Sequence, residues 1–435
     1  MEKIGIFGSG YVGLATAVTF GKLGHEVVCL DIIEEKVDAI NSGKSPIPEP
    51  EIEDGLKELT SKGRLRATLA PGDMQEVDII FICVDTPQDS DGNMDTEALD
   101  RAAHTTGHYL KDGQLIVVKS TVVPGTTRNA VGQSIGLIAQ GKKFGLCHNP
   151  EFLREGNALE DSMSPDRIVI GAMDENSGAR LLKLYGSFDC PKLVVEPETS
   201  ELIKYASNVF LAMKITYANE MANICELFGA DVEKVMEGIA LDKRISPHFL
   251  NAGAGFGGSC FDKDLRAIAN ASEQRGYFPS LVRAALLTNE VQPLRTVQLL
   301  NAAVENLEGK RIAVLGLAFK ENSGDVRNTR AAPIVDELAI QGAEIILFDP
   351  MAMENFRELG YGDLEYAGSA DEALEGADAA IIQTSWDEFR ALKPEKIKEL
   401  MRTPIIIDGR RTFVPEEMLA AGITYLGIGW KNFQL

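Results

Sequence analysis

Basic residues are in short supply in this sequence. Its 43 lysines and arginines stand against 65 acidic residues, which gives a formal net charge of -22 at pH 7 and an isoelectric point near 4.7. A chain of this charge is not expected to bind the phosphate backbone of a nucleic acid or an anionic membrane surface as a general partner. Because the acidic residues are spread along the chain, we expect them to form a solubilising surface.

Long apolar runs and paired cysteines are also missing. No apolar stretch approaches the roughly 20 residues of a membrane-spanning helix, and the first residues, MEKIGIFGSG, resemble a strand more than a signal peptide. We therefore expect a cytoplasmic protein. The six cysteines include no CxxC pair, so neither a metal site nor a disulfide framework is indicated. Five of them lie in apolar stretches and are expected to be inert core residues: Cys29, Cys83, Cys147, Cys190 and Cys225.

A glycine-rich turn near the N-terminus predicts a dinucleotide site. The residues suggest a strand over 3–7, a helix over 11–23 and a second strand over 26–30. Gly8 allows the tight turn, Gly10 admits a pyrophosphate and Gly13 allows close packing of helix and strand. The N-terminus of the helix offers free N–H groups to phosphate. Asp31, at the end of the second strand, would accept hydrogen bonds from ribose hydroxyls and repel a 2′-phosphate, which favours NAD over NADP.

Two further apolar runs, over 77–87 and 113–127, are expected to be buried parallel strands whose carboxyl ends face a ligand. Thr86 and Thr121 fall near those ends. They are interpreted either as contacts to the nicotinamide ribose or as simple turn residues.

The strand and turn pattern returns near the C-terminus. KRIAVLGLAFK, QGAEIILFDP and GADAAIIQTSW resemble the N-terminal strands in the same order, so two doubly wound α/β domains are expected. The second copy lacks the full glycine motif, because Gly316 is followed by Leu-Ala-Phe-Lys. We expect it to hold a different phosphate ligand, with Lys320 as the cation.

A long helix is predicted between the two copies. It would be capped by Thr199 or Ser200 and ended by Gly229, and its apolar residues cover nearly the whole circumference, as expected for burial between domains or subunits. Lys204 and Asn208 lie one turn apart on one face. A lysine on such an apolar helix is interpreted as functional, with a solvated surface lysine as the alternative.

The sixth cysteine, Cys260, stands apart from the others. It follows Gly255, Gly257 and Gly258, whose flexible backbone could pass close to a ligand, and it precedes a helix expected to begin near Asp262. The helix N-terminus and Lys263 would favour a thiolate over a thiol. A cysteine buried in a core does not need three neighbouring glycines. We therefore interpret Cys260 as a nucleophile.

Taken together, an NAD site and a thiolate predict a specific chemistry. NAD alone can oxidise an alcohol to an aldehyde, whereas a thiolate can trap the aldehyde as a thiohemiacetal, which is oxidised to a thioester and hydrolysed. The residues therefore indicate a four-electron dehydrogenase that converts an alcohol into a carboxylate and uses two NAD per turnover.

Seven motifs, in order along the whole chain, resemble the UDP-glucose/GDP-mannose dehydrogenase family. They are GSGYVGL, STVVPGTT, NPEFLREG, ELIKYASNVFLAMKITYANE, GFGGSCFDKD, GLAFK and IIDGR. Within the family, DKRISPHFLNAGAGFGGSC is most similar to the members that oxidise UDP-glucose to UDP-glucuronate. The resemblance implies an α/β fold in which two Rossmann-like domains, 1–196 for NAD and 301–435 for the nucleotide sugar, are joined by a helical middle domain, 197–300.

The resemblance also implies roles for individual residues. The catalytic group would be Cys260 as nucleophile, Lys204 and Asn208 for the oxyanion, Asp264 for proton transfer, Glu151 as base in thioester hydrolysis, and Thr121. The NAD contacts would be Gly8, Gly10, Tyr11, Val12, Gly13, Asp31, Lys36, Thr86, Thr121, Glu155, Lys263 and Arg327. The sugar nucleotide would contact Glu151, Phe152, Leu153, Glu155, Lys204, Asn208, Phe249, Asn251, Gly255, Gly257, Lys320 and Arg410. Arg244 would reach the site of a neighbouring subunit, which implies a homodimer or a larger homo-oligomer.

Three departures from the family pattern concern charge. Asp262 stands where a proline is common and adds a negative charge beside Cys260. ENSGDVRNTR replaces a more acidic segment, and Asp85 occupies a position where uncharged residues are frequent.

Other functions remain open at this stage. A GDP-mannose dehydrogenase would use the same cysteine chemistry on another substrate. A β-hydroxyacid dehydrogenase would need no thiol and would perform one oxidation. A nucleotide-sensing module would bind both ligands without turnover.

Overall fold

The computed structural model describes residues 1–430. The chain divides into two compact units, Met1–Ser207 and Asn208–Leu435. Each unit is built around one β-sheet.

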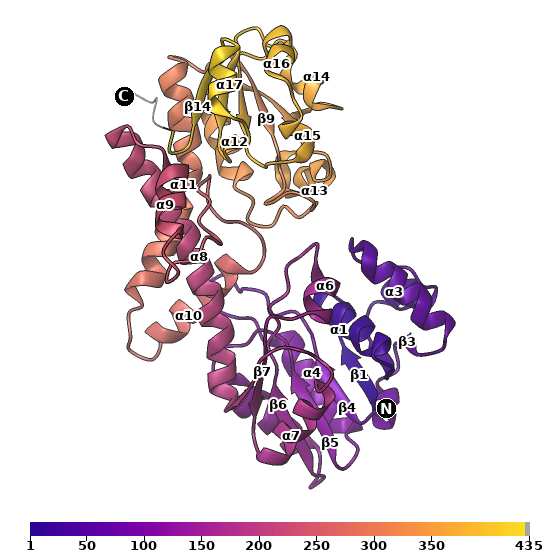
Figure 1. Cartoon of the computed structure of the whole chain (residues 1–435). Helices are drawn as coiled ribbons and strands as arrows, with labels where there is room; N and C mark the ends of the chain where they lie inside the picture. Colours follow the sequence, from indigo (N-terminus) through magenta and orange to yellow (C-terminus); the bar gives the residue numbers. More distant parts are fainter. Residues whose placement is uncertain (431–435) are drawn as a thin grey trace. The chain divides into compact units, whose positions relative to one another are not determined.

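The first unit contains an eight-stranded sheet in the order β3-β2-β1-β4-β5-β6-β7-β8, in which only the β6–β7 pair is antiparallel. Figure 1 shows β1, β4, β5 and β6 in this sheet. Its strands are β1 (Lys3–Phe7), β2 (Glu26–Leu30), β3 (Leu65–Thr68), β4 (Ile79–Ile82), β5 (Gln114–Val118), β6 (Phe144–His148), β7 (Ile168–Ala172) and β8 (Lys192–Val195). The predicted strands over 3–7 and 26–30 are confirmed, whereas β4 and β5 are shorter than the apolar runs that predicted them.

The central strands of the first sheet are buried on both faces. Along β5, Leu115 and Val117 belong to one apolar core, and Ile116 and Val118 belong to another. This alternation follows from the period of two in a strand, and burial on both sides explains the continuous apolar sequence. The helices that cover the sheet are α1 (Tyr11–Lys22), α2 (Glu34–Asn41), α3 (Pro50–Ser61), α4 (Glu97–Tyr109), α5 (Gln133–Ile138), α6 (Ala158–Met163) and α7 (Glu175–Leu184).

The second unit contains a six-stranded, fully parallel sheet in the order β11-β10-β9-β12-β13-β14. Its strands are β9 (Arg311–Leu315), β10 (Glu344–Phe348), β11 (Glu365–Tyr366), β12 (Ala379–Ile382), β13 (Ile405–Asp408) and β14 (Thr424–Gly427). The helices are α12 (Ala331–Ile340), α13 (Met353–Phe356), α14 (Ala370–Leu374), α15 (Asp387–Arg390), α16 (Pro394–Leu400) and α17 (Pro415–Ala420). The order repeats that of β3-β2-β1-β4-β5-β6, which is the arrangement of dinucleotide-binding sheets, so the predicted duplication is confirmed.

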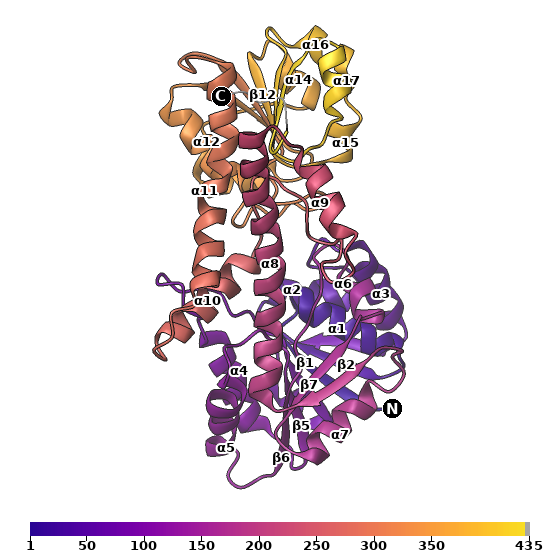
Figure 2. The same ribbon diagram turned by 60° about the vertical axis from the view of Figure 1, so that its left-hand side comes forward.

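The predicted long helix is α8 (Pro197–Phe228), which has 32 residues (Figure 2). It begins at Pro197, a residue suited to a first helical turn because its missing N–H costs nothing there. The predicted cap at Thr199 or Ser200 is therefore wrong. Gly229 follows the helix with a φ of 66°, the left-handed conformation that ends many helices, as predicted.

Three more helices follow α8: α9 (Val232–Ala240), α10 (Phe261–Glu273) and α11 (Ser280–Ala303). In the second unit α10 packs against α11 (Figure 2). The side chains of Ala218 and Ala222 on α8 and Leu299 on α11 join the apolar core of the second sheet. Among the described residues, no helix is both long and apolar enough to cross a membrane.

Candidate active site

The N-terminal turn has the geometry that the glycine motif predicts. Gly8 adopts a φ of 88°, which favours glycine. A Cβ atom at Gly13 would overlap the carbonyl oxygen of Gly8, whereas one at Gly10 would meet no described atom within 4 Å. The motif therefore leaves open space at Gly10, beside the N-terminus of α1, which begins at Tyr11. These features fit the pyrophosphate of a dinucleotide.

Asp31 lies directly after β2 and faces this turn. Its Oδ2 accepts hydrogen bonds from the amide (2.8 Å) and the hydroxyl of Ser9, and its Oδ1 accepts from the amide of Ile32 at 2.8 Å. Burial by itself would raise the pKa of Asp31, but the bonds from Ser9 and a contribution from the charge of Lys36 hold it below its usual value. The carboxylate is therefore ionised and held in place, as a ribose contact requires.

Thr86 and Thr121, which follow neighbouring strands, are brought together. The Thr86 hydroxyl donates to the carbonyl oxygen of Thr121 at 2.8 Å. Thr86 is 6% exposed. The bond joins the carboxyl ends of β4 and β5, the edge at which parallel sheets bind ligands.

Glu151 and Lys204 form a buried ion pair in the first unit. The Lys204 Nζ lies 2.8 Å from the Glu151 Oε1, and the Leu153 amide donates to the Glu151 Oε2 at 2.7 Å. Burial acts to raise the pKa of Glu151, but the charge and hydrogen bond of Lys204 lower it overall. The Lys204 ammonium also lies 5.5 Å from the centroid of the Phe152 ring. The solvated-surface alternative for Lys204 is therefore wrong.

Asn208 and Asp264 are joined in the second unit. The Asn208 Nδ2 donates to the Asp264 Oδ2 at 2.6 Å, and the Lys263 Nζ donates to the Asp264 Oδ1 at 2.6 Å. Asp264 is 1% exposed. Because Lys204 and Asn208 lie four residues apart on α8, their side chains leave the helix from the same face. Three of the predicted polar residues thus form one hydrogen-bonded group.

Cys260 immediately precedes α10 and is exposed. Its Sγ lies 3.6 Å from the Ser259 hydroxyl. The position before the helix N-terminus favours a thiolate. Lys263, which was predicted to add to this effect, is paired with Asp264. The helix is therefore the firmer source of thiolate stabilisation.

The additional carboxylate at Asp262 has a partner. The Arg266 Nε lies 2.9 Å from the Asp262 Oδ2, one helical turn away. The hydrogen bond that Arg266 donates to Asp262 raises the pKa of Arg266. The charge that Asp262 adds beside Cys260 is therefore offset within α10.

The glycines before Cys260 are required by close contacts with other parts of the protein. A Cβ at Gly257 would lie 2.6 Å from the carbonyl oxygen of Asn328, and one at Gly255 would lie 2.6 Å from the Asn289 Oδ1. Gly258 has a φ of 81° and passes close to the Phe319 ring. The sequence suggested that these glycines let the main chain approach a ligand. Their close contacts within the protein already require glycine at these positions.

The second glycine turn is closed by its own acid. Gly316 has a φ of 100°, and the amides of Leu317 and Ala318 donate to the Asp349 Oδ2 at 2.7 and 3.0 Å. Asp349 is 0% exposed and follows β10 as Asp31 follows β2. The first turn holds Asp31 in the same way through the Ser9 amide, whereas here two successive amides are bound to the acid.

Arg410 is engaged with the main chain. Its Nε donates to the carbonyl oxygen of Gln383 at 2.8 Å and its Nη1 donates to that of Gly255 at 3.1 Å. Burial lowers the pKa of Arg410 to about 10. The Nη2 has no partner among the described residues. Only this nitrogen retains its full donor capacity for a ligand.

The remaining predicted residues lie in varied surroundings. The Arg244 side chain is 89% exposed and bonds to Asp242, Arg327 pairs with Asp325, and Phe249 has a φ of 63° and is 38% exposed. Asn251 is exposed. The other predicted residues are half-buried: Tyr11, Val12, Lys36, Leu153, Glu155 and Lys320.

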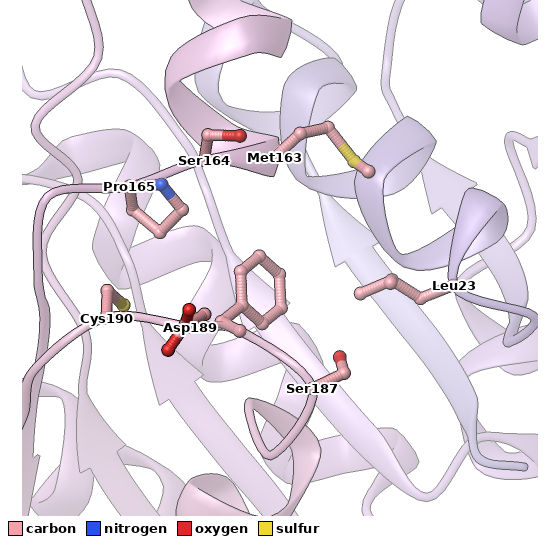
Figure 3. A pocket seen from close by; sticks show the side chains of 8 residues that line it. Leu23, Met163, Ser164, Pro165, Ser187, Asp189 and Cys190 are labelled. Atoms are coloured by element: carbon pink, nitrogen blue, oxygen red, sulfur yellow. The ribbon is translucent and has the colours of Figure 1, made fainter.

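Cys190 departs from the prediction of an inert core. The other four such cysteines are buried, but Cys190 is half-buried and lines a pocket of about 270 Å³ with Met163 and Phe188 (Figure 3). The remaining lining residues are Leu23, Ser164, Pro165, Ser187 and Asp189. None of the predicted site residues lines this pocket.

Sequence reasoning missed a buried cation next to Glu151. Lys119, at the end of β5, is 8% exposed, and its Nζ donates to the Asn149 Oδ1 at 3.0 Å. Burial is the main cause that lowers the pKa of Lys119, and the charge of Lys204 acts in the same direction. The sequence signal for this buried cation is a lysine directly after the apolar run of residues 115–118. Within residues 1–430 there is no group of three His, Cys, Asp or Glu side chains that could hold a metal ion.

Comparisons with known proteins cover the whole chain. Three family models match in order: the NAD-binding domain of the UDP-glucose/GDP-mannose dehydrogenase family over residues 2–189, its central domain over 198–291 and its UDP-binding domain over 313–415. NAD is therefore the cofactor of the first domain, and its residues fit that ligand.

Individual relatives agree with these matches. A UDP-glucose 6-dehydrogenase of Haloferax volcanii is 44% identical, with 96% of this chain and 98% of the relative covered. The UDP-glucose 6-dehydrogenase TuaD of Bacillus subtilis is 41% identical, with 99% and 93% covered. A solved UDP-glucose dehydrogenase from Pyrobaculum islandicum has a TM-score of 0.93 at 40% identity and covers 99% of this chain and 98% of its own. The chain belongs to the UDP-glucose/GDP-mannose dehydrogenase family.

Proposed function

We propose that this protein oxidises the C6 alcohol of UDP-glucose to the carboxylate of UDP-glucuronate and reduces two NAD per turnover. The single observation that carries the proposal is the exposed Cys260 at the N-terminus of α10, with the Asn208–Asp264–Lys263 group on neighbouring positions. The substrate follows from the relatives, because UDP-glucose 6-dehydrogenases match nearly the whole chain at about 40% identity.

The first half of the proposed reaction needs a base and hydrogen-bond donors that stabilise the negative charge on the substrate oxygen. NAD accepts one hydride at each of the two oxidations. As the alcohol is oxidised, its proton passes to a group of this chain, and Asp264 with a water is proposed for that role. Lys204 and Asn208 stabilise the alkoxide by donating hydrogen bonds from one face of α8.

The second half uses the thiolate. The Sγ of Cys260 forms a bond to the aldehyde carbon, which gives a thiohemiacetal, and the second hydride loss leaves a thioester. Water then breaks the carbon–sulfur bond, which releases the carboxylate and returns the thiol. Glu151, kept ionised by Lys204, is proposed as the base that takes a proton from this water.

The domain boundaries at 196/197 and 300/301 remain part of the proposal, as does the cytoplasmic location. So do the nucleotide contacts of Lys320 and Arg410, which would meet the two phosphates of UDP.

A homodimer is proposed on the basis of α8. Phe210, Tyr217 and Ile224 recur every seven residues and are 62%, 47% and 37% exposed. An apolar stripe with this spacing on a helix is suited to pairing with a second helix. Phe228, at the end of the helix, is 82% exposed and extends the stripe. Arg244, with its side chain 89% exposed, is proposed to reach the neighbouring subunit.

The experiment is a comparison of substrates. UDP-glucose, UDP-galactose, UDP-N-acetylglucosamine and GDP-mannose are each incubated with NAD, and the reduced cofactor is followed by absorbance. We expect a strong preference for UDP-glucose and two NADH per sugar nucleotide. Equal or faster turnover of GDP-mannose would contradict the substrate, and one NADH per substrate would contradict the four-electron chemistry.

A further inference from the structure

The loop of residues 251–257, which leads to Cys260, is held by amide side chains from two helices. Asn219 and Asn223 belong to α8, and Asn289 and Gln292 belong to α11. Asn219 is 0% exposed, and Asn289 and Gln292 are each 2% exposed. A buried amide destabilises the folded protein unless its polar atoms are bonded. Each of these amides has at least one hydrogen-bond partner, although the Asn219 Nδ2 and the Asn223 Oδ1 have none among the described residues.

Asn289 binds both main-chain groups of one loop residue. Its Oδ1 accepts from the Phe256 amide at 2.7 Å, and its Nδ2 donates to the Phe256 carbonyl oxygen at 3.0 Å. A side-chain amide that pairs with one peptide in this way fixes both the position and the orientation of that residue.

Gly253 is held in the same way by two residues. Its amide donates to the Asn219 Oδ1 at 2.7 Å, and its carbonyl oxygen accepts from the Gln292 Nε2 at 2.9 Å. Gln292 is itself held, because its Oε1 accepts from the Asn223 Nδ2 at 2.9 Å. The two helices are thereby linked to each other as well as to the loop.

The two residues between Gly253 and Phe256 are held by the segment that follows β13. The Ala254 amide donates to the carbonyl oxygen of Gly409 at 3.1 Å, and the Gly255 carbonyl oxygen accepts from the Arg410 Nη1 at 3.1 Å. Four successive residues, 253–256, therefore have main-chain bonds to α8, α11 or the segment that follows β13. A glycine-rich segment has a large conformational entropy, so a fixed shape needs such bonds.

We propose that Asn289 is a positioning residue for catalysis, which with Asn219 and Gln292 fixes the loop 251–257 in the shape that accepts the sugar nucleotide and presents Cys260. The proposal rests on the proposed function for the identity of the ligand. The bonds of the three amides go to the main chain of the loop, and none of the three is among the residues proposed to contact the reacting atoms. Their effect passes through the main chain of the loop, so it is independent of the side chains that the loop carries.

The test uses the full-length Asn289→Leu variant, which preserves side-chain size and removes both bonds to Phe256. We expect KM for UDP-glucose to rise about tenfold, equivalent to about 1.4 kcal/mol of binding, with a smaller change in kcat. Amide hydrogen exchange in a peptide covering 251–258 is expected to accelerate about tenfold. The KM for NAD is expected to stay unchanged. Asn301→Leu, the same substitution at an exposed site on α11, is the matched control and should behave as the wild type.

The Asn289→Asp variant keeps the experiment informative if the leucine variant does not fold. Its carboxylate still accepts from the Phe256 amide but cannot donate to the Phe256 carbonyl oxygen, so increases in KM and exchange are again expected. A folded Asn289→Leu protein with wild-type KM and wild-type exchange at 251–258 would overturn the proposal, and so would a raised KM without faster exchange. If UDP-glucose is not turned over at all, the proposed function fails, but the exchange measurement still tests the loop.

Discussion

The ion pair between Glu151 and Lys204 has a structural role in addition to the proposed chemical one. Their side chains are 11% and 5% exposed, so each charge depends on the other for compensation. Removing one partner of a buried pair typically costs about 3–5 kcal/mol because the remaining charge has no counter-ion. The same pairing keeps Glu151 ionised, as a base requires.

The first prediction follows from this pair. Glu151→Gln should lower the free energy of unfolding by about 3 kcal/mol at pH 7. Because Lys204 holds the folded-state pKa of Glu151 below the unfolded value, the stabilisation is present above the unfolded pKa, about 4.3. It is lost as the pH falls through the lower folded pKa. Urea titrations of both proteins from pH 7 to pH 3.5 measure this difference, which should shrink at the acidic end. A difference that is independent of pH would contradict the assignment.

The second prediction concerns the charge beside the nucleophile. Because Arg266 pairs with Asp262, removing the arginine alone weakens the compensation of the carboxylate near Cys260 and should raise the pKa of the thiol. Arg266→Gln should therefore need a higher pH for half-maximal alkylation of Cys260. The rate of reaction with iodoacetamide as a function of pH provides the measurement.

The double variant is the control for this effect. Asp262→Asn combined with Arg266→Gln removes both charges, so its alkylation profile should return toward that of the wild type. If Arg266→Gln and the double variant give the same profile, Asp262 does not act on the thiol.

At the level of elements, the glycine turn between β1 and α1 depends on one close approach. A methyl group at Gly13 would overlap the carbonyl oxygen of Gly8, so the turn and the helix would have to separate. The third prediction is that Gly13→Ala raises the Kd for NAD at least tenfold, because the amides at the start of α1 no longer lie where the pyrophosphate binds. Isothermal titration calorimetry with NAD measures the effect.

Gly136 in α5 offers a matched control, because a Cβ there meets no described atom within 4 Å. Gly136→Ala should leave NAD binding unchanged and stabilise the protein by up to about 1 kcal/mol, since alanine is the better helix former. Equal effects of the two substitutions on NAD binding would refute the steric argument.

Helices and strands could be predicted wherever the local sequence pattern determines them. The strands of the first βαβ unit and the end of α8 at Gly229 followed from apolar runs and glycine positions. The start of α8 did not, because Thr199, Ser200 and Pro197 all suit a helix N-terminus and only the fold selects among them. The antiparallel β6–β7 pairing was likewise invisible, since the direction of a strand depends on distant partners.

The candidate site shows the same limit. Cys260 and Asp31 were predicted as site residues from chemical types next to glycines and a strand end, and Lys204 was predicted from its place on an apolar helix. The burial of Lys119 and the amides that hold the loop 251–257 required the folded chain, because their partners lie far away in sequence. The local sequence around an asparagine or glutamine in a helix does not show whether its side chain lies at the surface or is buried and hydrogen-bonded.

At the level of the whole molecule, the exposed apolar stripe on α8 is the basis of the proposed dimer. The fourth prediction is that Phe210→Arg shifts the protein toward a monomer, because it places a charge in an apolar contact. Light scattering coupled to gel filtration measures the mass. Glu416→Arg changes an exposed polar residue of α17, away from the α8 stripe, and should leave the mass unchanged. A wild-type protein that is already monomeric would contradict the proposed interface.

The covalent role of Cys260 can be tested most directly by measuring product. Wild-type protein and Cys260→Ala are incubated with UDP-glucose and NAD, and UDP-glucuronate is quantified by mass spectrometry together with NADH. We predict two NADH per UDP-glucuronate for the wild type and no UDP-glucuronate above background for Cys260→Ala. Formation of UDP-glucuronate by Cys260→Ala at the wild-type rate would contradict a thioester on this residue.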